Sequence, residues 1–235
     1  MSNIAIIPAR GGSKRIPKKN IRDFLGKPII AYPIIAALES HIFDEVMVST
    51  DSQEIADMAK KYGAKVPFLR STKNSDDHAT HADVIKEVLA EYKKRGQEYE
   101  YFFCLYPAPF VTSKKLKEAL ELLKRTGASA VVPVTQFGFP IQRSLKINDK
   151  GRIELIWPEN MNVRSQDLMP TYHDVGQYFG AKVKSFLGDQ KIYLKNKIPI
   201  ITPESEVQDI DTEEDWKLAE IKFEIFDKKE KRSSK

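Results

Sequence analysis

The sequence predicts an α/β fold with a mostly parallel sheet, and two observations support this prediction. Short apolar segments typical of buried strands alternate with segments of helical periodicity as far as residue 134. Glycine and polar residues follow the first two strand-like segments, as expected where ligands bind at the carboxyl edge of an open parallel sheet. With 235 residues, the chain is long enough for one large domain that carries an insertion.

A βαβ unit is predicted at the start of the chain. Residues 4–7 form an apolar run suited to a buried parallel strand, and a helix follows that begins near Pro28 or Pro33 and continues to Leu38. Residues 44–51 are expected to form a second strand that ends in polar groups. Because the crossover of such a unit is right-handed, the residues after both strands should meet at one edge of the sheet.

The alternation continues through the middle of the chain. Ser52 is a suitable N-cap for a helix over residues 52–62, and Gly63 is a suitable stop. The elements predicted next are a short strand at 65–69, a helix at 82–94, a strand at 101–105, a helix at 113–123 and a strand at 129–134. The helix at 82–94 has apolar residues at helical spacing, which predicts that one face packs on the sheet.

Residues 135–180 break this rhythm, because they contain many turn formers and aromatic residues without clear helical periodicity. We expect an antiparallel excursion here, in which residues 143–147 pair with residues 152–156 across a turn at 148–151. A two-stranded ribbon is marginally stable in water, so its apolar residues need a cover. The sequence therefore predicts that this arm packs against a second subunit.

The C-terminal part returns to the alternation. A strand is predicted at 198–201 and a helix at 212–226, with Thr212 as its N-cap and Asp215 placed as in a capping box. Residues 228–235 carry five basic groups and one acid. We expect residues 227–235 to be a disordered basic tail.

Charge and composition argue against several classes of protein. Most of the net charge of +5 lies in residues 228–235, so the body is nearly neutral and lacks the spread of basic residues that nucleic-acid binding requires. We find neither a signal-peptide pattern nor an apolar run near the ~20 residues of a membrane span. Cys104 is the single cysteine, within an apolar segment, and is expected to be a reduced core residue of a cytoplasmic protein.

The loop after the first strand, residues 8–20, has the composition of an anion-binding site. Two glycines allow close approach of the backbone to a ligand, and five basic residues accompany them: Arg10, Lys14, Arg15, Lys18 and Lys19. The loop matches neither the P-loop nor the dinucleotide-binding pattern. We interpret it as a cradle for a nucleoside triphosphate, and the alternative is a solvated basic loop.

A second group of polar residues precedes the predicted last helix. Asp209 and Asp211 are two apart, so in an extended segment both carboxylates lie on one side and could share Mg²⁺, which prefers oxygen ligands. The alternative is that these acids only favour the helix N-terminus, which explains residues 213–215 better than the pair. His78 and His81 are interpreted as surface or nucleotide contacts and not as zinc ligands.

Three motifs resemble the cytidylyltransferases that activate sialic-acid-type sugars to CMP-sugars. The motifs are IPARGGSKRIPKKN at residues 7–20, VSTD at 48–51 and DIDTE at 209–213, and the resemblance continues to about residue 226. Arg15, where N-acetylneuraminate enzymes usually have glycine, is most similar to the pseudaminic acid branch, as are residues 164–168 and 172–178. The resemblance implies a Rossmann-like three-layer nucleotidyltransferase fold, with residues 1–226 as one domain and 135–180 as a dimerisation arm reaching the partner's active site.

The resemblance also implies a role for individual residues. Nucleotide binding is expected from Ala9, Arg10, Gly11, Ser13, Lys14, Lys19, Asn20, Arg70, Thr80 and His81. Sugar contacts are expected from Tyr106, Arg164, Tyr172 and Gln177, and Mg²⁺ ligation from Asp209 and Asp211. Catalysis is expected to depend on Arg10, Lys19 and Asp211. The implied reaction is attack by the anomeric hydroxyl of pseudaminic acid on the α-phosphorus of CTP, with release of pyrophosphate.

One motif departs from the family pattern. The family usually has a P-T-[SA]-P turn after the central strand, whereas residues 106–109 read YPAP, which is one residue short and lacks the hydroxyl. Alternatives therefore remain open: another nonulosonic acid such as N-acetylneuraminic or legionaminic acid, 3-deoxy-manno-octulosonic acid, a glycosyltransferase with an aspartate pair, or a catalytically silent nucleotide-binding module.

Overall fold

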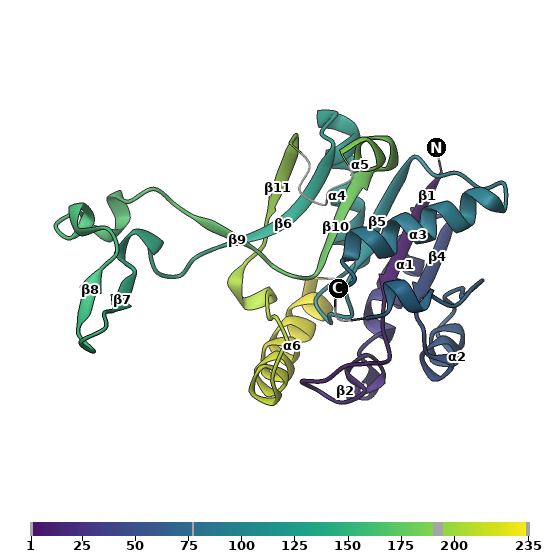
Figure 1. Ribbon diagram of the computed structural model, residues 1–235, viewed down its shortest axis with the longest axis horizontal. Coiled ribbons are helices and arrows are strands. Elements are labelled where there is room, and N and C mark those ends of the chain that lie inside the picture. Colours follow the sequence, from purple (N-terminus) through teal and green to yellow (C-terminus); the bar gives the residue numbers. More distant parts are fainter. Residues whose placement is uncertain (1, 77, 190–194, 234–235) are drawn as a thin grey trace.

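A seven-stranded sheet forms the centre of the computed structural model, which describes residues 2–76, 78–189 and 195–233 (Figure 1). The strand order is β11-β6-β10-β5-β1-β4, and β9 pairs with β6 beside this path. The strands are β1 (Asn3–Pro8), β4 (Glu45–Ser49), β5 (Tyr101–Leu105), β6 (Ala130–Gln136), β9 (Tyr172–Asp174), β10 (Tyr178–Lys182) and β11 (Lys197–Ile201). The parallel pairs are β1 with β4, β1 with β5, and β11 with β6.

Strand β10 runs antiparallel between β5 and β6 and was not predicted. Its first residues, 178–180, fall within the excursion predicted at 135–180, where turn formers and aromatic residues give no clear helical periodicity. Gly180 has a packing reason: a Cβ atom there would lie 2.6 Å from the ring of Phe103 on the neighbouring strand. The glycine thus allows β10 to lie between β5 and β6 without a clash.

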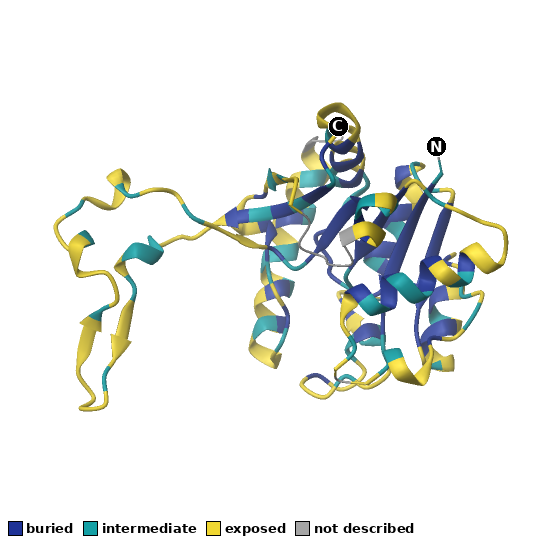
Figure 2. Ribbon diagram, turned by 45° about the horizontal axis from the view of Figure 1, so that its top comes forward, coloured by how far each residue is buried: buried dark blue, intermediate teal, exposed yellow. Residues whose placement is uncertain are grey.

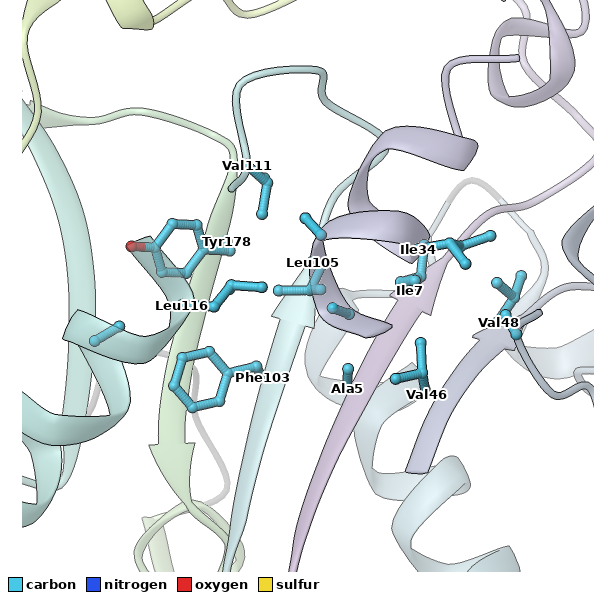
Figure 3. Close-up of a cluster of buried hydrophobic side chains, with 14 of the residues drawn as sticks. Ala5, Ile7, Ile34, Val46, Val48, Phe103, Leu105, Val111, Leu116 and Tyr178 are labelled. Atoms are coloured by element: carbon cyan, nitrogen blue, oxygen red, sulfur yellow. The ribbon is translucent and has the colours of Figure 1, made fainter. Parts of the chain in front are cut away.

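Three helices cover one face of the sheet: α1 (Ala31–Ser40), α2 (Gln53–Lys61) and α4 (Ser113–Thr126). Figure 3 shows the core beneath them, where Ile7 and Leu105 from the strands meet Ile34 of α1 and Leu116 of α4. All four side chains are fully buried. Burial of such apolar surface is the main contribution to the stability of a fold of this kind.

The opposite face is covered by α3 (His81–Lys94) and α5 (Val183–Asp189). Alternate residues of the same strands point to this side, including Ile6 and Cys104, which pack with Ile85 and Phe186. Cys104 is free and buried, as predicted. The result is a helix–sheet–helix sandwich, which confirms the predicted three-layer α/β fold.

The last helix, α6 (Glu213–Ser233), is longer than predicted. Thr212 and Asp215 form the expected reciprocal bonds at its start: the Asp215 N–H donates to the Thr212 hydroxyl at 3.2 Å, and the Thr212 N–H donates to the Asp215 carboxylate at 2.8 Å. Residues 227–233 are helical and not the disordered tail we expected. Lys229 lies 2.9 Å from the buried Glu206, which holds this end of the helix on the body.

Most other predicted elements are confirmed with small changes at their ends, but the strand at 65–69 is wrong. Lys65 makes one isolated bridge to Met47, and the segment then leaves the sheet. Pro67 has no N–H to donate to a further ladder bond. The remaining short elements are a hairpin of β2 (Asp23–Phe24) and β3 (Lys27–Pro28) and 3₁₀ turns at Lys19–Ile21, Thr72–Asn74, Ile141–Arg143, Pro158–Asn160, Ser165–Asp167 and Glu204–Glu206.

The excursion is an arm that projects away from the sheet and carries the predicted ribbon of β7 (Leu145–Ile147) and β8 (Ile153–Leu155) (Figure 1). Figure 2 shows that the ribbon is mostly exposed. Ile147 and Ile153 are 76% and 68% exposed, so the single chain gives these apolar side chains no cover. Among the described residues, no helix has the length and apolar character needed to cross a membrane.

Candidate active site

A cavity of about 560 Å³ opens beyond the carboxyl ends of β1 and β5. Pro8 at the end of β1 and Tyr106 after β5 are among its walls. The predicted site residues that line it are Arg10, Ser13, Lys14, Lys19, Asn20, Arg70, His81, Tyr106, Asp209 and Asp211. The basic loop and the acid pair, which are far apart in the sequence, therefore share one cavity.

The basic loop is held in shape from its own side of the sheet. The Asn20 side-chain amide donates to the carbonyl of Arg10 at 2.9 Å, which closes the loop across its base. The N–H of Gly11 donates to the Asp51 carboxylate at 2.8 Å, so the end of β4 fixes the glycine turn. Lys18 has left-handed backbone geometry and an ion pair with Glu54 at 2.8 Å, and it does not line the cavity.

Apolar packing connects the loop to the acid pair. Ile16 of the loop and Ile210, which separates the two acids, are buried in one cluster with Trp216 of α6. Asp209 is exposed and Asp211 half-buried, while Ile210 between them points into the cluster. This alternation places both carboxylates on the cavity side, as predicted from an extended segment.

Two cations of the loop already contact the acidic segment. The ammonium group of Lys19 donates to the carbonyl of Ile210, and Arg15 makes an ion pair with Asp211 at 2.5 Å. Burial lowers the pKa of Lys19, while the charges of Asp209 and Asp211 oppose this shift. The cavity thus has a positive and a negative wall in direct contact.

The opposite side of the cavity contains Arg70, His81 and Tyr106. Arg70 is 8% exposed, and its guanidinium donates to the Ser49 hydroxyl at 3.0 Å and the Ser49 carbonyl at 2.5 Å. Burial lowers the pKa of Arg70. The rings of His81 and Tyr106 meet edge to face, with centroids 4.7 Å apart. Desolvation, followed by the charges of Arg70 and Arg10, lowers the pKa of His81.

Three predicted nucleotide contacts do not line the cavity. Ala9 is buried, and its N–H donates to the Ser49 carbonyl at 2.9 Å. Gly11 is bound to Asp51, as described above, and a Cβ atom there would approach Ser52 to 3.1 Å. Thr80 is the N-cap of α3 and forms a capping box with Asp83. The positions of these residues support the loop and the helix that carry the lining side chains.

Three predicted sugar contacts also lie away from the cavity. Arg164 is on the exposed arm, and Tyr172 is on β9, 45% exposed, where the arm begins. Gln177 is 1% exposed, and its amide donates to the carbonyl of Glu206 at 2.6 Å, while its side-chain oxygen has no hydrogen-bond partner among the described residues. In one chain, Tyr106 is the predicted sugar contact that faces the cavity.

Sequence reasoning missed several residues of the cavity wall, including Asn74, Asp76 and Asp174. Asp76 accepts a hydrogen bond at its backbone carbonyl from Arg10 at 3.1 Å, which links the stretch after Arg70 to the basic loop. Asp174 ends β9 and accepts from the Gly176 N–H at 2.6 Å. A polar residue at the end of a strand is a detectable signal, but β9 itself was not predicted.

Among the described residues, no group of three or more His, Cys, Asp and Glu side chains is arranged to hold a metal ion. The acid pair alone supplies two carboxylates at the cavity. That number is typical of Mg²⁺ sites in which phosphate oxygens and water complete the coordination. The donor set therefore fits such an ion when a polyphosphate is also bound.

Comparison with known proteins agrees with this arrangement. A family model described as cytidylyltransferase matches residues 4–205. A pseudaminic acid cytidylyltransferase of Campylobacter jejuni is 40% identical over 226 residues, which is 96% of this chain and 97% of the relative. A CMP-N,N'-diacetyllegionaminic acid synthase of Legionella pneumophila is 36% identical over 96% of this chain and 97% of its own length.

A solved structure of a CMP:2-keto-3-deoxy-manno-octonic acid synthetase complexed with CTP has the same fold, with a TM-score of 0.68 at 16% identity over 97% of this chain and 100% of that chain. The fold, the shared cavity and the sequence comparisons lead to one conclusion. The chain belongs to the cytidylyltransferase family and is a nucleotidyltransferase.

Proposed function

We propose that this enzyme transfers a CMP group from CTP to pseudaminic acid. The observation that carries the proposal is the cavity that joins a glycine-rich basic loop to an acid pair. Identity of 40% to a pseudaminic acid cytidylyltransferase supports the choice of sugar. The anomeric hydroxyl attacks the α-phosphorus of CTP, the new C–O–P bond forms, and pyrophosphate leaves. CTP is a cytoplasmic nucleotide, so we infer that the reaction occurs in the cytoplasm.

The residues of the basic wall bind the nucleotide in this proposal. Arg10, Ser13, Lys14 and Lys19 hold the triphosphate, because cations and hydrogen-bond donors aimed at developing negative charge stabilise departing pyrophosphate. Asn20 of the loop contacts the base and ribose together with Arg70 and His81, which lie on the opposite side of the cavity. The anchoring of Arg70 by Ser49 keeps its guanidinium in place without reorganisation during the reaction.

Asp209 and Asp211 are the proposed ligands of Mg²⁺. A bound Mg²⁺ would neutralise phosphate charge and polarise the reacting phosphoryl group. The two carboxylates orient toward the same cavity as the basic loop, since Ile210 between them is buried. Calorimetry in the presence of CTP should therefore detect a divalent cation whose binding is lost in Asp209→Asn.

We also propose that the enzyme is a homodimer formed through residues 135–180, which belong to one nucleotidyltransferase domain. Support comes from the ribbon of β7 and β8, where several apolar side chains are exposed close together. Exposed apolar residues that occur as a group, and not singly, are typical of protein–protein interfaces. Arg164 and Tyr172 would then contribute to the sugar site of the partner subunit. Light scattering should give twice the mass of 26.9 kDa.

The test of the activity is a panel of sugar acids incubated with CTP and Mg²⁺, with pyrophosphate release as the readout. Pseudaminic acid should give the highest kcat/KM, and legionaminic and N-acetylneuraminic acids should be poorer substrates. Preference for another acid would reassign the sugar while the reaction class stands. CTP binding without turnover of any acid would contradict the proposed reaction and favour a silent nucleotide-binding module.

A further inference from the structure

The ion pair between Arg15 and Asp211 joins the two walls of the cavity. Arg15 comes from the loop after β1 and Asp211 from the segment before α6, and their closest atoms are 2.5 Å apart. The side chains are 70% and 40% exposed. An exposed ion pair of this kind contributes little to stability, so its position at the cavity needs another explanation.

The carboxylate that Arg15 occupies is one of the two oxygen ligands proposed for the metal. Lys19, by contrast, donates to the carbonyl of Ile210, which is not one of the proposed metal ligands. Arg15 contacts one oxygen of the Asp211 carboxylate, and a guanidinium and a divalent cation on the same carboxylate repel each other. Arg15 therefore competes with a metal ion for the Asp211 carboxylate.

Arg15 has a second anionic partner available once it is released. It lines the cavity with Arg10, Lys14 and Lys19, on the wall where the triphosphate is proposed to bind. Guanidinium groups bind carboxylate and phosphate oxygens with the same planar geometry. Release from Asp211 therefore leaves Arg15 beside phosphate oxygens and not in open solvent.

We propose that Arg15 stands in for the metal at Asp211 in the ligand-free enzyme and moves to the nucleotide phosphates when the metal binds. The exchange couples the two ligands: metal frees a phosphate-binding group, and the phosphates remove a competitor of the metal. By linkage, each ligand strengthens binding of the other by the same factor. This role of Arg15 rests on the proposed function, because it takes Asp211 as a metal ligand.

The experiment compares Arg15→Gln with Arg22→Gln as a matched control. Arg22 makes an ion pair with Glu213 that is also 2.5 Å long and joins the same two parts of the chain, but neither residue lines the cavity. Mn²⁺ is titrated into each protein without nucleotide and followed by electron paramagnetic resonance. Arg15→Gln should bind Mn²⁺ about two- to fivefold more tightly than the wild type, as expected for loss of an exposed ion-pair competitor.

CTP affinity is then measured by calorimetry with Mn²⁺ and with EDTA. Mn²⁺ should strengthen CTP binding less in Arg15→Gln than in the wild type, again by about two- to fivefold, since the exchange is lost. Chelation by CTP in solution is the same for every protein and cancels. Arg15→Lys retains the charge and should stay near the wild type, and Arg22→Gln should match it.

Unchanged or weaker Mn²⁺ binding by Arg15→Gln would overturn the proposed exchange. This holds even if the wild type is fully active and the proposed function is correct. Equal tightening in Arg22→Gln would also overturn it, because the effect would then be general electrostatics. Absence of CTP binding by the wild type would contradict the proposed function instead, and the Mn²⁺ titration would still judge the competition at Asp211. Circular dichroism melting curves check that each variant is folded.

Discussion

The arm and the cavity proposed to bind the nucleotide differ in how much of their structure one chain supplies. The cavity is lined by residues from several elements, and its key side chains are anchored: Arg70 by Ser49, and Ile210 by the cluster around Trp216. The ribbon of the arm has exposed apolar residues, and the predicted sugar contacts Arg164 and Tyr172 lie on or beside the arm. This contrast teaches that nucleotide binding should belong to a single chain and sugar binding to an assembly.

Substitution of the acid pair, Asp209 and Asp211, gives the strongest test of the proposal that one chain supplies the nucleotide site. Asp209→Asn and Asp211→Asn should each lower kcat by about 100-fold or more, because each removes a charge proposed to hold the metal ion at the reacting phosphates. CTP should still bind weakly, since the basic wall is intact. Pyrophosphate release measures the first effect and calorimetry the second.

Glu213→Gln is the matched control for these variants. Glu213 is also an acid at the start of α6, but it pairs with Arg22 and does not line the cavity. Its activity should stay close to that of the wild type. Full activity in both aspartate variants would place the metal elsewhere.

The arm gives the next largest effect. Ile147→Lys combined with Ile153→Lys should convert a dimer to monomers and reduce kcat/KM for the sugar roughly tenfold, because the partner no longer positions its contacts. The melting temperature of the monomer should not fall through lost packing, since these side chains are 76% and 68% exposed. Analytical ultracentrifugation and CTP calorimetry measure mass and nucleotide affinity.

Leu187→Lys controls for the cost of placing a charge on an exposed apolar site, because Leu187 is 47% exposed on α5. It should leave mass and activity unchanged. If the arm variant remained dimeric with normal sugar kinetics, the division between a one-chain and a two-chain half of the site would be wrong.

The sheet is closely packed at Gly180, and a substitution can test this packing. Gly180→Ala should lower the free energy of unfolding by about 1–3 kcal/mol, because the new Cβ atom meets the ring of Phe103. Gly188→Ala is the control, since a Cβ atom there has no heavy atom within 4 Å. Urea denaturation should show loss of stability in the first variant alone.

His81 gives the smallest expected effect, at the rim of the cavity. Its pKa in the folded state is lowered, so the unfolded chain binds a proton at a pH where the folded protein does not. The ordinary pKa of histidine is 6.5. His81 therefore has no effect on stability well above pH 6.5, and stability declines slightly as the pH falls below that value. His81→Gln should remove the part of the stability loss that His81 causes, which melting curves between pH 7.5 and 5.5 would show. If stability declined equally in the variant, the lowered pKa of His81 would not be its cause.

Sequence patterns predicted much of the fold because local signals and tertiary packing agree. The helix after Ser52 begins where its cap requires, with the Ser52 side chain accepting from Ile55, and the apolar face of α3 is buried against the sheet. Strand β10 escaped prediction because its place between β5 and β6 depends on partners far away in the chain. A glycine in its middle, Gly180, is explained only by the ring beside it.

The candidate site was predictable where local sequence signals mark it, and not where its residues depend on distant parts of the chain. The loop and the acid pair carry dense local signals, and they were expected to lie together because bound triphosphate needs both cationic groups and a metal ion. Arg164 and Tyr172 came from resemblance, and no local rule places residues of an arm relative to a cavity. Asp174 is the last residue of β9, which pairs with β6 over three residues and is too short for an alternation pattern to reveal.

The path of the chain into and out of the arm has a practical consequence. Gln136 at the end of β6 pairs with Tyr172 of β9, and the next residue, Phe137, donates its N–H to the carbonyl of Thr171 at 3.0 Å. The arm is thus the extended tip of a hairpin whose two legs stay adjacent. A short turn joining 137 to 171 would excise it without moving either leg, leaving a shortened protein that keeps the cavity and on which a different arm could be grafted.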